Sequence, residues 1–227
     1  MWFALLLTTM GASPTAIGAV MVDGEQLFTI EHFEQDLGDG VVQIRRRTLD
    51  QKGAVAYTVH AKLKNGLQQD MQTDHPQRKL KGRVRFDNGV VRYELTKADG
   101  SVERDTDRVD GPVMSAPGLV SFMQRDAVWR DLLAGETVEL TYVSWSRQST
   151  YGFRLKKSSR STDRKTVVVM QPSSWIIRQV FPDIFYTFRT EDRRLTRYQG
   201  QISVKKVEPD GDLSDVVADV RFRYPRG

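Results

Sequence analysis

The stretch that decides the fold is RVRFDNGVVRYEL, residues 83–95. Apolar and charged side chains alternate on both sides of Asn88-Gly89, and this alternation is typical of strands with one face in water. Asn-Gly is a strong hairpin signal, because both residues tolerate a positive φ. The stretch therefore predicts two antiparallel strands joined by a tight turn.

Similar turn signals recur on either side of this hairpin. They are Gly38-Asp39-Gly40, Gln51-Lys52-Gly53, Lys64-Asn65-Gly66 and Ala98-Asp99-Gly100. The run 55–63 between two of them alternates in the same way, with Val55, Tyr57, Val59, Ala61 and Leu63 on one face. Short, even spacing of turns and alternating runs predicts a β-meander.

The periodicity changes to that of a helix in the middle of the chain. Apolar residues recur at helical spacing between Ser115 and Gly135, and a second short helix is predicted from Ser173 or Ser174 to Pro182. Alternating or β-branched runs then predict further strands, the last at 216–224.

We therefore expect a mostly β protein of about nine to eleven antiparallel strands with two short helices. So many strands rarely form one flat sheet, so a single curled sheet is predicted, either a half-barrel or a closed barrel. The helices should cover its concave side or one end. No linker divides the chain, so 20–227 is expected to be one β-rich domain.

Residues 1–19 are interpreted as a signal peptide. The first 22 residues carry no charged side chain, Trp2–Leu7 is apolar, and small residues follow at Ala16, Gly18 and Ala19. Cleavage is expected after Gly18 or Ala19, which predicts an exported, periplasmic protein. The alternative is an uncleaved N-terminal membrane anchor, although the apolar run is shorter than the roughly 20 residues needed to span a bilayer.

Composition limits the chemistry and the partners. The chain has no cysteine, which excludes disulfides, thiolate metal sites and thiol nucleophiles. Its formal net charge is +5, with the bases spread among acids. This pattern fits a solvated face or contact with an anionic envelope surface. Nucleic acid is not an expected partner for an exported protein, and the oligomeric state is left open.

No catalytic, metal or cofactor motif is found, and the protein is expected not to be an enzyme. His32, His60 and His75 lack metal-ligand spacing. The acidic turn 210–215 lacks the alternating ligands of a calcium loop. Ser203 and Lys206 match a Ser-x-x-Lys pattern, but on a strand rather than on a helix. Paired carboxylates of an envelope-polysaccharide enzyme remain open, and the available acids are Asp107, Asp110, Glu191 and Asp192.

Aromatic residues of the second half are the best lead to a binding site. Most of them should belong to the core, but some are expected to line an apolar cavity between the sheet and the helices. The predicted ligand-binding residues are Phe122, Trp129, Trp145, Tyr151, Trp175 and Phe181.

Four stretches, 117–122, 129–136, 172–175 and 194–200, resemble uncharacterised exported proteins of Gram-negative bacteria. Their architecture is similar to that of the half-barrel lipoprotein-carrier (Lol-type) superfamily, in which a curled sheet and covering helices hold acyl chains. The resemblance implies a periplasmic binder of lipids or lipoproteins, although a lipidated cysteine is absent. We thus expect a non-enzymatic periplasmic binding protein for an apolar or lipid-like ligand. The alternative is a structural or protein-interaction component of the envelope.

Overall fold

The computed structural model describes residues 13–225, which form one continuous sheet, three α-helices and a short 3-10 helix. The first half of the sheet comprises β1 (Ala16–Val22), β2 (Glu25–Asp36), β3 (Val41–Asp50), β4 (Val55–Lys64), β5 (Leu67–His75), β6 (Leu80–Asp87), β7 (Val90–Thr96) and β8 (Val102–Arg108). The second half comprises β9 (Val113–Met114), β10 (Val138–Ser144), β11 (Ser149–Lys157), β12 (Lys165–Pro172), β13 (Ile184–Arg189), β14 (Leu195–Val207) and β15 (Leu213–Arg223). The helices are η1 (Pro76–Arg78), α1 (Ala116–Gln124), α2 (Asp126–Leu133) and α3 (Trp175–Val180).

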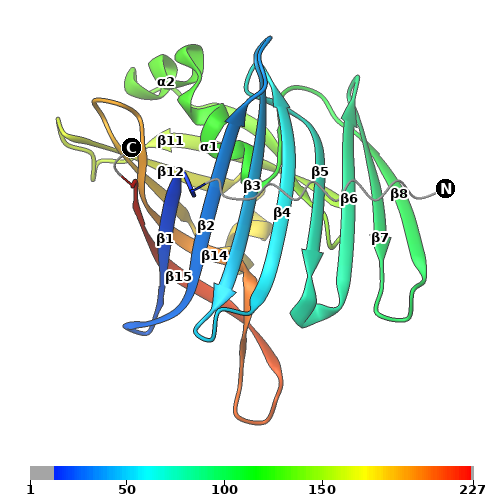
Figure 1. The fold of residues 1–227 in the computed structure, drawn as a ribbon. Coiled ribbons are helices and arrows are strands. Elements are labelled where there is room, and N and C mark those ends of the chain that lie inside the picture. The colour runs from blue at the N-terminus through cyan, green and yellow to red at the C-terminus, as the bar shows by residue number, and fades with distance from the viewer. Residues whose placement is uncertain (1–12, 226–227) are drawn as a thin grey trace.

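The sheet consists of two antiparallel meanders joined in the middle. One runs from β1 to β8 and the other from β10 to β15, and β15 pairs with β1. Strand β9 adds to β10 in parallel, so β8 and β9 are the two edges. The sheet curls strongly without closing (Figure 1), which confirms a curled antiparallel architecture. The expected number of nine to eleven strands was wrong, because the sheet has 15 strands within residues 13–225.

Several strands were missed because they lack an alternating apolar pattern. Strand β8 has the sequence VERDTDR, and nearly all of its side chains are exposed. Charged side chains on both faces of an edge strand oppose pairing with another chain. Strand β9 has only two residues, and the first four residues of β1 fall within the predicted signal peptide.

The first helical region is two helices rather than one. Arg125 has extended backbone angles, φ −60° and ψ 137°, and separates α1 from α2. Ser115 stands at the predicted N-terminal boundary of α1, but its hydroxyl donates to the side-chain oxygen of buried Gln68, 2.8 Å away, rather than capping the helix. This contact anchors α1 to β5 inside the curl of the sheet.

The interior contains two main apolar clusters rather than one. The first joins α1 and α2 to β10–β13 and includes Phe122, Trp129, Phe153 and Phe188. The second lies between β1, β4–β7 and β14–β15, and Val20 and Val220 belong to it. The curl therefore brings the inner faces of the two meanders together, and the region where they meet is the candidate location for a ligand site.

Contacts across the curl join the two meanders at the end opposite α1 and α2. The side-chain amide of Gln77 donates to the Lys205 carbonyl at 2.8 Å and accepts from the Lys205 amide at 3.0 Å. Buried His75 donates through Nε2 to the Ser203 carbonyl at 2.9 Å. Both contacts lie where β14 shifts register between Ile202 and Lys205. The bulge frees backbone groups for these partners.

The turn between β10 and β11 also crosses the curl. The Trp145 ring stacks on Tyr57 at a centroid distance of 6.4 Å. It covers Gly82 so closely that a Cβ there would lie 2.4 Å from the Trp145 ring. Near the open edge, Asp107 of β8 accepts hydrogen bonds from Tyr93 at 3.2 Å and from Thr150 of β11 at 3.0 Å. Side chains thus connect the edge strand β8 to β11 of the other meander.

The predicted cleavage positions lie inside β1. Residues 1–12 are outside the described part of the chain, but Ala16–Val22 pairs with β2 on one side and with β15 on the other. Gly18 lies beneath Phe222, and a Cβ at Gly18 would approach that ring to 2.9 Å. The small residues read as a peptidase site therefore have a packing role in the sheet.

Candidate functional site

A chain of polar contacts lies on the concave face of β2 and β3, near the end covered by α1 and α2. Arg46 donates through Nε to Nδ1 of His32 at 3.1 Å, and Nε2 of His32 donates to Glu34 at 3.4 Å. Burial lowers the pKa of His32 below its ordinary 6.5, so the ring is neutral at pH 7. A neutral imidazole accepts at one nitrogen and donates at the other, as this chain requires. We call Arg46, His32 and Glu34 the interior polar trio.

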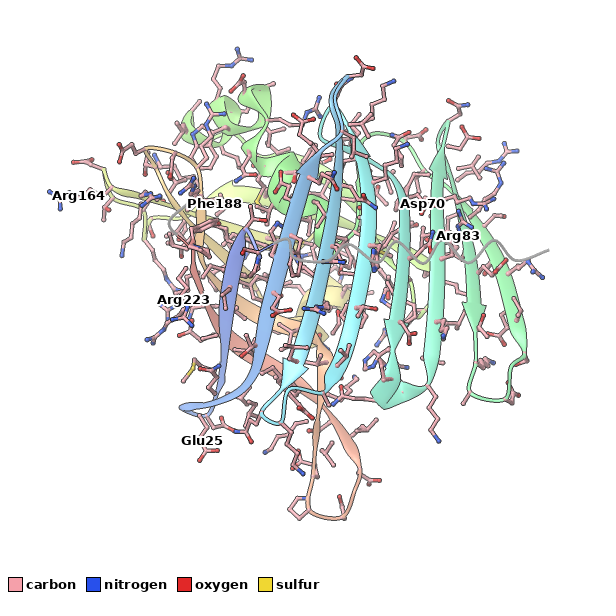
Figure 2. The ribbon with its side chains drawn as sticks, in the orientation of Figure 1. Glu25, Asp70, Arg83, Arg164, Phe188 and Arg223 are labelled. Atoms are coloured by element: carbon pink, nitrogen blue, oxygen red, sulfur yellow. The ribbon has the colours of Figure 1, made fainter. Side chains whose placement is uncertain are left out.

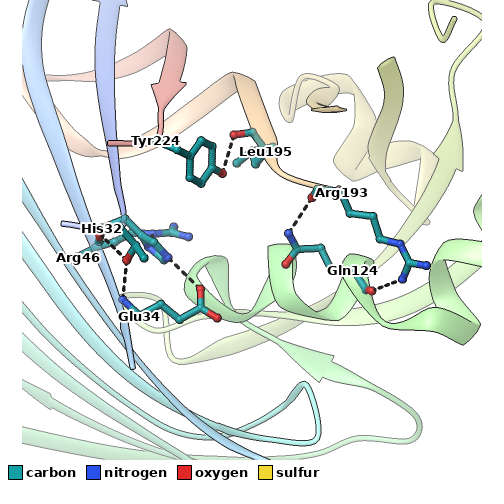
Figure 3. Close-up of polar contacts among 8 residues, drawn as sticks. His32, Glu34, Arg46, Gln124, Arg193, Leu195 and Tyr224 are labelled. Atoms are coloured by element: carbon teal, nitrogen blue, oxygen red, sulfur yellow. Dashed lines mark hydrogen bonds and ion pairs between the residues drawn. The ribbon is translucent and has the colours of Figure 1, made fainter. Parts of the chain in front are cut away.

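The trio faces aromatic residues from the opposite wall. Figure 3 shows it across the interior from the Tyr224–Leu195 contact and from Gln124, which exchanges hydrogen bonds with Arg193. Four tyrosines from different strands or their ends lie close enough to Arg46 to affect its pKa or to have their own pKa affected by it: Tyr57, Tyr186, Tyr198 and Tyr224. Arg46 therefore lies in the middle of the curl rather than at a rim.

This region is deep and yet accessible. Arg46, Tyr142 and Tyr198 are neither fully buried nor fully exposed, so each keeps part of its surface accessible to water. Tyr198 and partly buried Phe222 pack against both apolar clusters, so they lie between them. These partly exposed side chains lie on the concave side of the sheet, where water or a ligand can reach them. The inner face between the two clusters is our candidate site.

The six predicted ligand-binding residues are distributed over different places. Phe122 and Trp129 are buried in the first cluster, and Trp145 stacks on Tyr57 across the curl. Tyr151 and Phe181 pack against the first cluster and remain partly accessible, whereas Trp175 on α3 is 67% exposed. The fold thus brings five of them to the interior side of the sheet and leaves Trp175 in solvent. Their role in binding stays a prediction.

The trio itself was missed from the sequence. Arg45, Arg46 and Arg47 read as one basic run, but successive strand residues point to opposite faces. Arg45 lies over the Phe33 ring and Arg47 pairs with Glu31, both on the outer face, whereas Arg46 points inward. The inward direction of Arg46 could be recognised from its position on the strand, because Arg46 alternates with Ile44 and Thr48 and both of these are buried.

The outer face offers two shallow hollows, and ion pairs occupy part of the wall of each. One, of about 370 Å³, is lined by residues including Asp70 and Arg83, whose side chains lie 3.2 Å apart (Figure 2). The other, of about 660 Å³, includes Asp219, which pairs with Arg197 at 2.6 Å and with Arg221 at 3.5 Å. Internal pairing of this kind leaves few groups free for a ligand.

The remaining candidates for chemistry have structural partners. Asp107 is held by Tyr93 and Thr150, and Arg189 lowers the pKa of Asp192 to about 2 by hydrogen bonding. His60 lies on the outer face, beside the first hollow. Within residues 13–225, no three His, Asp or Glu side chains are arranged to hold a metal ion.

Enclosed tyrosines predict a loss of stability at high pH. Burial raises the pKa of Tyr142 to about 12, and it raises those of Tyr57, Tyr186 and Tyr198 as well. In the unfolded chain these groups ionise near pH 10, so above about pH 10 the folded state binds more protons than the unfolded state. Stability should therefore fall as the pH rises from about 10 to 12. Urea unfolding across this range tests it, with phenolate absorbance counting the ionised tyrosines. Full ionisation of all seven tyrosines near pH 10 in the folded protein would contradict it.

Comparisons with known proteins identify no relative. No family model matches the chain, and no curated protein or solved structure matches it. In the part of the chain that the structure describes, none of the helices has the length and apolar character needed to cross a membrane. The resemblance to Lol-type carriers therefore remains an expectation, and any function has to be argued from the interior site itself.

Proposed function

We propose that this protein is a non-enzymatic binding protein for an apolar or lipid-like molecule held on the concave side of its curled sheet. The observation that carries the proposal is the set of partly exposed side chains on the concave face between the two apolar clusters. Binding sites for small molecules are typically concave and mostly apolar, with a few placed polar groups. Tyr142, Tyr198 and Phe222 supply apolar walls of this kind, and the interior polar trio supplies the polar groups.

The charged outer face of the sheet favours a binding site inside the curl over a site on the outer face. Ion pairs between neighbouring strands cover much of the outer face, such as Arg47–Glu31 and Arg104–Glu94. Exposed ion pairs of this kind keep a sheet solvated and contribute little binding energy. The periplasmic location is part of the same proposal and depends on the export signal expected from the sequence.

The test is native mass spectrometry of the purified protein, followed by extraction into organic solvent. We expect a co-purifying apolar molecule in near-stoichiometric amount, or uptake of one after incubation with lipids. A matched pair of variants locates it. Ile30→Glu places a charge on the inner face of β2, and Thr29→Glu places the same charge on the outer face. Uptake should fall only in Ile30→Glu. A bare protein mass that lipids leave unchanged would refute the proposal.

A second candidate is a structural or protein-interaction role. The end of the β14–β15 hairpin projects beyond the rest of the sheet (Figure 1) and carries exposed Val207 and Leu213. Exposed apolar groups of this kind are typical of contact surfaces. Pull-down of a partner that Val207→Asp no longer captures, together with a bare protein mass, would favour this second role.

A further inference from the structure

The guanidinium of Arg46, inside the curl, has no counter-ion in direct contact within the described part of the chain. Among residues 13–225 its one hydrogen-bond partner is His32, which Nε contacts, so both Nη groups lack a partner there. Glu34 is reached only through the His32 ring. Arg46 is partly exposed, and neither Nη atom is among the fully buried atoms that lack a partner, so both Nη groups are accessible to water or to a ligand inside the curl.

The groups around Arg46 are suited to an apolar chain. The Tyr186 and Tyr198 rings meet edge to face with centroids 5.2 Å apart, and Tyr198 packs against both apolar clusters. The Tyr186 hydroxyl has only the Met170 sulfur as a partner among the described residues, at 4.0 Å. An arginine fork next to aromatic walls matches a molecule that is apolar along its length and anionic at its end.

We propose that Arg46 binds the anionic end group of an amphiphile whose apolar chain lies against the tyrosines between the two clusters. This inference rests on the proposed binding function and specifies its ligand class. The shared chemistry is an oxyanion with two free oxygens on a long hydrocarbon, which a carboxylate or a phosphate monoester supplies. His32 positions Arg46: its Nδ1 accepts the Nε hydrogen and leaves the two Nη groups directed to the ligand.

The experiment measures binding of four probes to the delipidated full chain by titration calorimetry. Palmitate and hexadecyl phosphate carry both the chain and the anion, methyl palmitate carries the chain alone, and inorganic phosphate carries the anion alone. Palmitate or hexadecyl phosphate should bind about tenfold or more tightly than methyl palmitate, because charge-assisted hydrogen bonds are worth more than neutral ones. Inorganic phosphate should bind far more weakly than either amphiphile. The stronger of the two anionic amphiphiles identifies the end group.

Variants of one strand locate the effect. Arg46→Gln should abolish the preference for the anionic probes over the ester, while Arg47→Gln on the outer face should keep it. Arg46→Lys should keep part of it, because it retains the charge but not the fork. Arg46→Gln is expected to fold about as stably as the parent, since Arg46 has no direct counter-ion in residues 13–225 and its hydrogen bond to His32 is the one described contact that is removed. This expectation separates a ligand-binding role from a structural one.

Two results would overturn the inference. Equal binding of palmitate, hexadecyl phosphate and methyl palmitate to the parent protein would leave the binding function intact and exclude Arg46 as an anion site. A preference that persists in Arg46→Gln would do the same. Failure of every probe with a hydrocarbon chain to bind would instead refute the binding function on which the inference rests.

Discussion

A chain that begins at Val20 is expected to be at least about 3 kcal/mol less stable than one that begins at Ser13, given about 1 kcal/mol for each lost backbone hydrogen bond. The shorter chain lacks Ala16–Ala19, which pairs with β2 and β15 near the centre of the sheet. It also uncovers Phe222, which packs on Gly18. Thr15, whose hydroxyl bridges the His32 carbonyl and the Glu34 amide, is lost as well.

The two chains both lack residues 1–12, so they differ only in β1 and its flank. Their urea midpoints give the difference in stability directly. Equal midpoints would mean that residues 13–19, including the first four residues of β1, contribute nothing to the stability of the folded state and that cleavage after Ala19 leaves the domain intact. The intact mass of the protein purified from cells then decides where its N-terminus lies. We expect any mature N-terminus to precede Ala16, because cleavage within β1 would leave Phe222 and the edges of β2 and β15 uncovered.

Local patterns predicted the parts of the fold that local chemistry controls. Asn88 and Gly89 have φ values of 47° and 75°, and Asp87 pairs with Val90, as the hairpin prediction requires. Strand β8 escaped because its stability depends on pairing with β7 rather than on its own apolar residues. The break at Arg125 escaped because the helical spacing of apolar residues continues across it. The number of strands and the open edge depend on pairing between distant segments, which periodicity does not encode.

The kind of candidate site could be predicted from the sequence, but its position could not. Sequence reasoning placed apolar ligand contacts between the sheet and the helices, whereas the accessible interior lies between two apolar clusters that different strands build. The inward direction of Arg46 follows from its register opposite His32 on β2 and Val59 on β4. The pairing register depends on which faces of the three strands are buried together. A single strand, taken alone, does not show which of its two faces points inward.

Trp129→Ala is expected to cost about 3 to 5 kcal/mol, the usual range for removing a large aromatic side chain from a core. The Trp129 ring is 4% exposed and meets Phe188 edge to face at 5.4 Å. Arg193 lies over the same ring at 5.5 Å, and Arg193 also bonds the Gln124 carbonyl at the end of α1. The substitution should therefore loosen α2 and its link to the β13–β14 turn together.

Trp175→Ala is the matched control, because this ring is 67% exposed on α3. Its expected effect on the unfolding free energy is within about 0.5 kcal/mol, as for most surface substitutions. Both residues were predicted to bind ligand, so the pair separates packing from binding. If Trp175→Ala lowers ligand uptake without changing the urea midpoint, α3 contacts the ligand despite its exposure. If Trp129→Ala leaves the urea midpoint unchanged, the first cluster does not depend on the Trp129 ring for its stability. The space around the ring would then be open to a ligand. A loss of uptake by Trp129→Ala that parallels its loss of stability assigns Trp129 to the scaffold that holds the interior site in shape.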